Sequence, residues 1–98
     1  MWADYDSQGD TVQIELERVR KLGHGEEVEG GSAVVGICEG RPVRIDVLSA
    51  RRCGVESPLA AAAERYELDA EALIAAAQAA LAAPDRTVML AVGVQAAA

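Results

Sequence analysis

The spacing of apolar residues changes near residue 53, and this change limits what the chain can fold into more than any other feature. Before it, residues 12–17 (VQIELE) and 43–47 (VRIDV) alternate strictly between apolar and polar. After it, Leu73, Ala77 and Leu81 recur at helical spacing. Alternation is typical of strands with one buried face, and the later spacing is typical of an amphipathic helix. The sequence therefore predicts an α+β fold, an antiparallel β-meander followed by two helices and a C-terminal strand.

The length of 98 residues suggests one domain. Within it we expect three parts: a β-meander over residues 1–52, a helical segment over 53–85 and a C-terminal strand over 86–95. The last part contains TVMLAVGV, which is apolar on both faces. A strand of that kind needs a neighbour, so we expect it to pair beside the first sheet or to cross to a second subunit.

Proline and acidic residues predict the limits of the helices. Ser57 is the expected N-cap of the first helix, and Pro58 suits its first helical position. Asp69 is the expected N-cap of the second helix, and Pro84 should end it. These positions predict two short helices in succession.

The segment DYDSQGDTVQIE offers the first candidate site. Four of its residues occupy positions one, three, six and twelve of an EF-hand calcium loop: Asp4, Asp6, Gly9 and Glu15. An EF-hand needs a helix entering the loop, but only three residues precede Asp4, and residues 12–17 alternate as a strand. We therefore expect a tight turn, with Gly9 at positive φ and with Asp6 and Asp10 capping the turn backbone.

The glycine-rich segment 18–31 reads as a loop, with at most a brief strand at 26–29. His24 is the one histidine, so a site with two or three histidines is impossible within one chain, and a solvated loop residue is expected. Cys38 and Cys53 lack metal-ligand spacing and should be reduced, small buried residues. Cys53 follows two arginines, which could lower its pKa, but an inert thiol is the favoured reading. No catalytic constellation, metal site or cofactor is predicted.

The net charge of −7 disfavours nucleic acid and anionic membranes as partners. Against that background, residues 41–52 carry four arginines and one acid: Arg41, Arg44, Arg51, Arg52 and Asp46. The arginines could contact an anion or a nucleic acid, or could pair across the sheet with Glu15 and Glu17, which is the favoured reading. Residues 70–83 lack Lys and Arg, so they cannot serve as a DNA-recognition helix. The residues predicted to bind a partner are Arg44, Arg51, Arg52, Glu15 and Glu17.

The first half of the chain also resembles a known family. The segments YDSQGDTVQIEL and EEVEGGSAVVGICEGRPVRIDVLSARR resemble the small bacterial and archaeal proteins called domain of unknown function 2283, over residues 1–52. The matched positions are Tyr5, Asp6, Asp10, Ile14, Leu16, Glu26, Glu27, Ile45, Leu48 and Ala50. The resemblance implies no catalytic residues, and it implies an antitoxin-like partner of a small basic toxin. The chain departs from the family pattern where Ile37-Cys38 directly precedes Glu39.

Charge and resemblance together predict a non-catalytic protein-binding module, antitoxin-like, homodimeric and cytoplasmic. The start MWADYD is acidic and no long apolar segment follows it, which predicts neither a secretory signal nor a membrane span. Two alternatives from other classes stay open. One is a module that binds a small ligand or metal through the acidic turn and the glycine loop, and the other is a structural homo-oligomeric subunit.

Overall fold

The computed structural model describes residues 1–21 and 23–90, which form a six-stranded antiparallel sheet and a layer of helices. The strands follow the order β3-β4-β5-β2-β1-β6 across the sheet. Their bounds are Trp2–Asp6 (β1), Thr11–Glu15 (β2), His24–Val28 (β3), Ala33–Cys38 (β4), Arg41–Val47 (β5) and Thr87–Met89 (β6). The predicted α+β class, with an antiparallel sheet before the helices and a strand after them, is confirmed.

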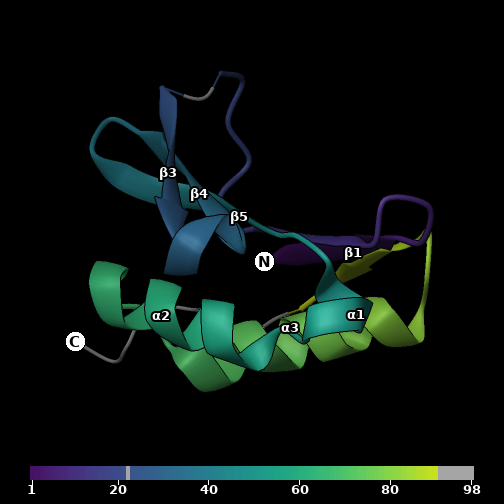
Figure 1. Ribbon diagram of the computed structural model, residues 1–98. Helices are drawn as coiled ribbons and strands as arrows, with labels where there is room; N and C mark the ends of the chain where they lie inside the picture. The colour runs from purple at the N-terminus through teal and green to yellow at the C-terminus, as the bar shows by residue number, and fades with distance from the viewer. Residues whose placement is uncertain (22, 91–98) are drawn as a thin grey trace.

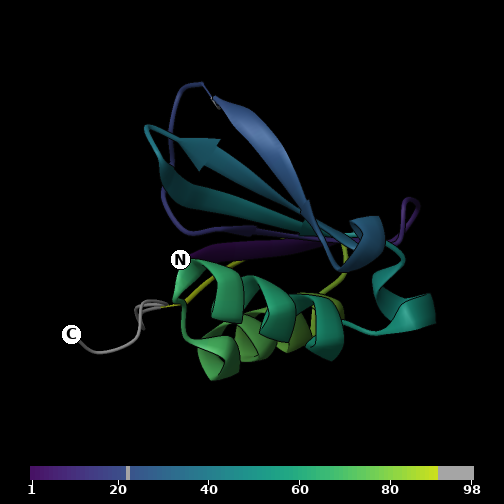
Figure 2. The ribbon, with the colours of Figure 1, turned by 60° about the vertical axis from the view of Figure 1, so that its left-hand side comes forward.

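The helices lie on one side of the sheet (Figures 1 and 2). They are α1 (Ala50–Cys53), α2 (Glu56–Tyr66) and α3 (Ala70–Ala82), and a 3₁₀ turn, Glu29–Gly31, joins β3 to β4. In Figure 2, α2 and α3 lie beneath the sheet, and no helix of the described chain lies on its other side. The fold therefore has two layers, with a core between them and one sheet face without a helical cover.

The core forms because the alternating residues share one face of the sheet. Val12 lies opposite Val47 and Ile14 opposite Ile45, and all four are fully buried. The inward orientation predicted for the apolar residues of β5 is confirmed, as is the outward orientation of its polar residues. The pairing of β2 with β5, with buried residues opposite one another, therefore joins the β1–β2 hairpin to β5, β4 and β3.

Alanines allow α3 to approach the sheet closely. Leu73, Ala76, Ala77 and Ala80 are all 0% exposed, and α3 packs against β1 and β2. Small side chains bring the helix backbone near the sheet, so a core without phenylalanine still fills its volume. The alanine-rich stretch is thus a packing surface of the domain.

Two turns behave differently from one another. The predicted Glu39-Gly40 hairpin is confirmed, with φ of 52° and 78°, as a two-residue turn of the primed type requires. In the first hairpin the left-handed residue is Asp10, with φ of 50°, whereas Gly9 has no positive φ. The predicted role of Gly9 was therefore wrong. A Cβ there would lie 2.9 Å from an Asp6 carboxylate oxygen, so any larger residue at position 9 would require the Asp6 side chain to shift.

The glycine-rich segment is more ordered than a loop, because His24–Val28 forms β3 at the sheet edge. Its predicted brief strand started two residues too late. Glu26 faces the helices and accepts a hydrogen bond from the Tyr66 hydroxyl, and Arg65 donates to the Glu27 carbonyl at 3.1 Å. Contacts from α2 hold this strand, which is a tertiary effect that the local glycine content did not indicate.

The start of the helical segment also differs from the prediction. Strand β5 ends at Val47 and α1 begins at Ala50, so the meander stops before residue 52. Ser57 is not an N-cap: it lies inside the first turn of α2, where its hydroxyl donates to Glu29. The Ser57 hydroxyl therefore bonds to Glu29, which is distant in the sequence, and does not cap α2.

The predicted second cap is confirmed, since Asp69 accepts from the Ala72 backbone N–H at 3.2 Å and α3 ends before Pro84. The C-terminal strand covers Thr87–Met89 and pairs with β1 of the same chain, Met89 opposite Trp2. Of the two predicted places for this strand, the one beside the first sheet is confirmed for these residues. Arg86 and Leu90, also predicted to belong to the strand, lie outside it, and residues 91–95 lie outside the described residues.

Candidate functional site

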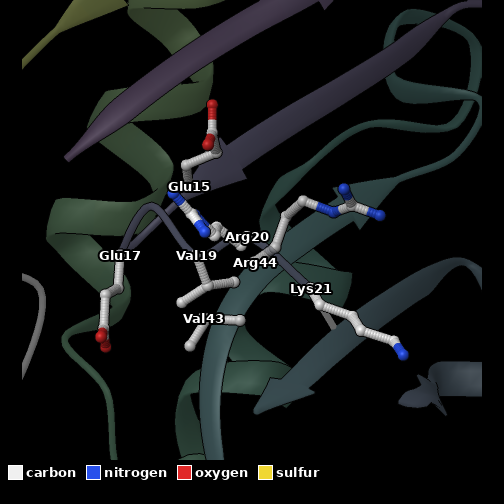
Figure 3. Close-up of a pocket in the computed structure, with 7 residues that line it drawn as sticks. All are labelled: Glu15, Glu17, Val19, Arg20, Lys21, Val43 and Arg44. Carbon is white, nitrogen blue, oxygen red and sulfur yellow. The ribbon is translucent and has the colours of Figure 1, made fainter. Parts of the chain in front are cut away.

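Three of the predicted partner-binding residues line one cavity at the end of the β2–β5 pair. This cavity, called here the loop pocket, has a volume of about 370 Å³ and is bounded by the connection between β2 and β3 (Figure 3). Its lining residues are Glu15, Glu17, Val19, Arg20, Lys21, Val43 and Arg44. Figure 3 shows the two valines at the centre of the group and the charged side chains around them. The fold thus brings Glu15, Glu17 and Arg44 together, as predicted.

The pairing within this group differs in detail from the prediction. Arg44 lies opposite Glu15 in the strand register, but its closest carboxylate is Asp46, at 3.5 Å. Glu17 pairs with Arg41, which donates to both of its oxygens at 2.7 and 2.9 Å. The Arg41 hydrogen bonds lower the pKa of Glu17, and they raise the pKa of Arg41. Within the described residues no ion pair engages Arg20 or Lys21, which line the loop pocket from the connection.

Arg51 and Arg52 do not belong to this group. Both lie in α1, beyond the opposite end of β5 from Arg41. Arg51 donates to the Leu81 carbonyl at 3.0 Å and lies over the Tyr5 ring, 5.2 Å from its centroid. The predicted basic cluster is therefore split into two places, because Arg41 and Arg44 lie on β5 whereas Arg51 and Arg52 lie in α1, beyond its far end.

At the α1 end of the molecule, the Asp10 carboxylate joins three groups by hydrogen bonds. Asp10 accepts backbone hydrogen bonds from Arg51 at 2.8 Å and Arg52 at 3.2 Å, and one from the Tyr5 hydroxyl at 2.8 Å. The Arg51 hydrogen bond, followed by that from Tyr5, lowers the pKa of Asp10. Asp10 was predicted to cap its own turn, but it caps α1, about forty residues further along the chain.

The acidic turn has the geometry of a hairpin and not of a calcium loop. Asp4 and Asp6 lie on β1, and Glu15 ends β2, pairing with Trp2 in the register. Asp6 accepts from the Gln8 backbone N–H at 3.0 Å, which is the predicted turn-capping contact. Among residues 1–21 and 23–90, no three side chains of the kinds that ligate metals are grouped to hold an ion.

The face of the sheet opposite the helices is called here the open face. Its outward residues on β1, β2, β4, β5 and β6 include Trp2, Asp4, Asp6, Thr11, Gln13, Glu15, Val34, Arg44, Asp46, Thr87 and Met89. Met89 is 76% exposed and is the register partner of Trp2, over which the Arg18 guanidinium lies at 4.3 Å. An apolar pair therefore sits at one end of a mainly acidic face.

Two carboxylates of the open face have raised pKa values. Asp4, Gln13 and Asp46 follow one another across β1, β2 and β5. Partial burial, and then the charges of Glu15 and Asp6, raise the pKa of Asp4. Partial burial is also the main cause that raises the pKa of Asp46; the Arg44 charge opposes this rise, and the smaller effect of the Asp4 charge adds to it. Asp46 Oδ1 is buried without a donor among the described residues. The row of Asp4, Gln13 and Asp46 therefore carries two carboxylates, and Arg44 pairs with only one of them, Asp46.

The remaining candidates have simpler environments. His24 is exposed at the start of β3, with Nε2 3.1 Å from a Glu26 oxygen, so it is solvated as predicted but lies in a strand. Cys53 is exposed and Cys38 is half-buried, so the prediction of two buried thiols was wrong. Cys53 ends α1, and Gly54 follows with φ of 91°.

Trp2, Met89, Arg20 and Lys21 were missed by the sequence reasoning. Met89 becomes notable only once β6 pairs with β1, and Arg20 only once the connection folds beside Val43. The single tryptophan on an acidic strand was the one available signal, because tryptophan is enriched at interfaces.

A scan against protein-family models, a search of curated proteins and a search of solved structures each gave no match to this chain. Across residues 1–21 and 23–90, no helix has the length and apolar character needed to cross a bilayer.

Proposed function

We propose that this chain is a non-catalytic protein-binding module whose open face docks a basic partner. The observation that carries the proposal is the pairing of exposed Met89 with Trp2 beside the partly buried carboxylates Asp4 and Asp46. Interfaces commonly place an aromatic or methionine anchor beside polar groups that specify the partner. A helix-free sheet face with these residues is a surface on which another protein can lie flat.

Charge complementarity supports a basic partner. The outward strand residues of the open face include the carboxylates Asp4, Glu15 and Asp46 and the single arginine Arg44. A lysine or arginine from a partner would neutralise carboxylates that now repel one another. The resemblance to domain of unknown function 2283 favours a small basic toxin as that partner, which would make the chain antitoxin-like.

Trp2 provides a direct test, because it is the only tryptophan of the chain and lies on the open face. A tryptophan-free peptide of lysine and leucine should change the Trp2 emission saturably, and the change should weaken with salt. The double variant Asp4→Asn/Asp46→Asn should bind at least about tenfold more weakly, since two charge-assisted contacts are lost. Glu64→Gln/Glu71→Gln is the matched control, with the same charge change on exposed helix positions.

Equal binding by the two double variants would show that net charge alone attracts the peptide, and it would overturn the docking proposal. Saturable binding with an unchanged Trp2 emission would place the contact elsewhere, and it would also overturn the docking proposal. A basic protein that co-purifies with the wild-type chain and is lost with Asp4→Asn/Asp46→Asn, but kept with the control, would extend the result to a natural partner.

Self-association is a second candidate, favoured by the exposed Met89 beside Trp2. Two copies could meet through this apolar pair, which fits the predicted homodimer. Light scattering should then give a dimer for the intact chain and a monomer for Met89→Lys. A monomeric intact chain would exclude this candidate and leave the external partner.

A further inference from the structure

We infer that the loop pocket binds a small organic anion, namely a monocarboxylate with a short branched aliphatic chain. This inference does not depend on the proposed docking function, because it uses the cavity beside the β2–β3 connection and not the open face. The cavity volume of about 370 Å³ suits a ligand of a few carbon atoms. Val19 and Val43 supply an aliphatic surface, and charged side chains surround it (Figure 3).

The ion pairs leave two positive charges free at this cavity. The Glu17 carboxylate is already held by Arg41, and Arg44 lies 3.5 Å from Asp46. Arg20 and Lys21 line the cavity without an ion-pair partner in the described chain. On a chain with a net charge of −7, such a place is where an anion is least repelled.

The same lining limits how much charge the ligand can carry. Glu15 and Glu17 border the cavity; in Figure 3 Glu17 lies on the other side of the valines from Lys21, and Glu15 lies above them, near Arg20 in this view. A ligand with one carboxylate can face the cations while its apolar end lies on Val19 and Val43. A polyanion would also approach the two glutamates, so a single carboxylate fits better than a phosphate.

The test is an NMR titration of the ¹⁵N-labelled full-length chain with isovalerate, acetate and inorganic phosphate. Isovalerate should shift amides of residues 15–21 and 43–44 and bind at least about tenfold more tightly than acetate, since each buried methylene is worth about fourfold. Arg20→Gln/Lys21→Gln should weaken isovalerate binding at least about tenfold. The control Arg52→Gln/Arg86→Gln removes the same charge from exposed positions outside the cavity and should change affinity less than about twofold.

The inference fails if isovalerate gives no saturable shift at these residues, or if acetate binds as tightly, because the valine surface would then contribute nothing. It also fails if phosphate binds more tightly than isovalerate, or if the control weakens binding as much as Arg20→Gln/Lys21→Gln. Arg20 and Lys21 are exposed, so their variants should keep the dispersed spectrum of the folded chain. Val19→Ser provides a second arm, since it should abolish the preference for isovalerate over acetate.

Discussion

The Asp10 carboxylate accepts a hydrogen bond of 2.8 Å from the backbone N–H of Arg51, which joins the first hairpin to the start of the helical layer. A second bond from Arg52 and one from the Tyr5 hydroxyl complete the arrangement. Asp10 therefore acts as a cap supplied from the turn between β1 and β2, where its backbone is left-handed. The contact links two parts of the chain that have different hydrophobic periods.

We expect Asp10→Ala to lower the melting temperature by about 5 °C, since α1 loses a capping group and Tyr5 loses its acceptor. The folded pKa of Asp10 is lowered, so its stabilisation is present above the unfolded pKa and is lost as the pH falls through the folded pKa. The difference in melting temperature between wild type and variant should therefore shrink towards pH 2. A difference that stays constant from pH 7 to pH 2 would contradict the capping role.

Asp46→Asn should stabilise the protein at pH 7 by no more than about 1 kcal/mol, since solvent screens a partly exposed group. Burial raises the folded pKa of Asp46, so the charged form costs stability above that pKa, and the cost disappears as the pH falls below the unfolded value. Chemical denaturation at pH 7 and pH 3 would measure the gain and its loss. Glu64→Gln should show neither, and a destabilised Asp46→Asn would mean that the Arg44 ion pair outweighs burial.

Leu73→Ala should cost about 2–5 kcal/mol of unfolding free energy, because Leu73 is fully buried between α3 and the sheet. Leu48→Ala removes the same atoms from a residue that is 41% exposed and should cost about 0.5 kcal/mol. Urea denaturation of the two variants measures both values. Similar costs for the two would contradict the placement of α3 over the sheet.

Tyr66 should ionise far above an ordinary tyrosine. Burial, and then the hydrogen bond to Glu26, raise its pKa to about 12. Its contribution to stability is therefore complete below the unfolded pKa near 10 and is lost as the pH rises through about 12. Ultraviolet titration at 295 nm would follow the phenolate, with Tyr66→Phe to assign it. Glu26→Gln should lower this pKa only in part, because burial is the larger cause, and an unchanged pKa would exclude the contact.

The sequence by itself determined the elements whose signals are local. Alternation in β2 and β5 identified strands and their buried faces, because side chains of a strand point to opposite sides in turn. The Glu39-Gly40 turn and the Asp69 cap were also predictable, since each depends on neighbours within three residues. These signals were enough for the α+β class, and they placed Glu15, Glu17 and Arg44 on adjoining elements.

Only the tertiary structure decided the features that join distant segments. Strand β3 forms in a glycine-rich segment because α2 holds it through Glu26 and Tyr66. Asp10 caps α1 and not its own turn, and the paired β6 puts Met89 beside Trp2 on the open face. Contacts of this kind depend on backbone placement in three dimensions, which no local spacing encodes, and so both proposed binding surfaces emerged only with the fold.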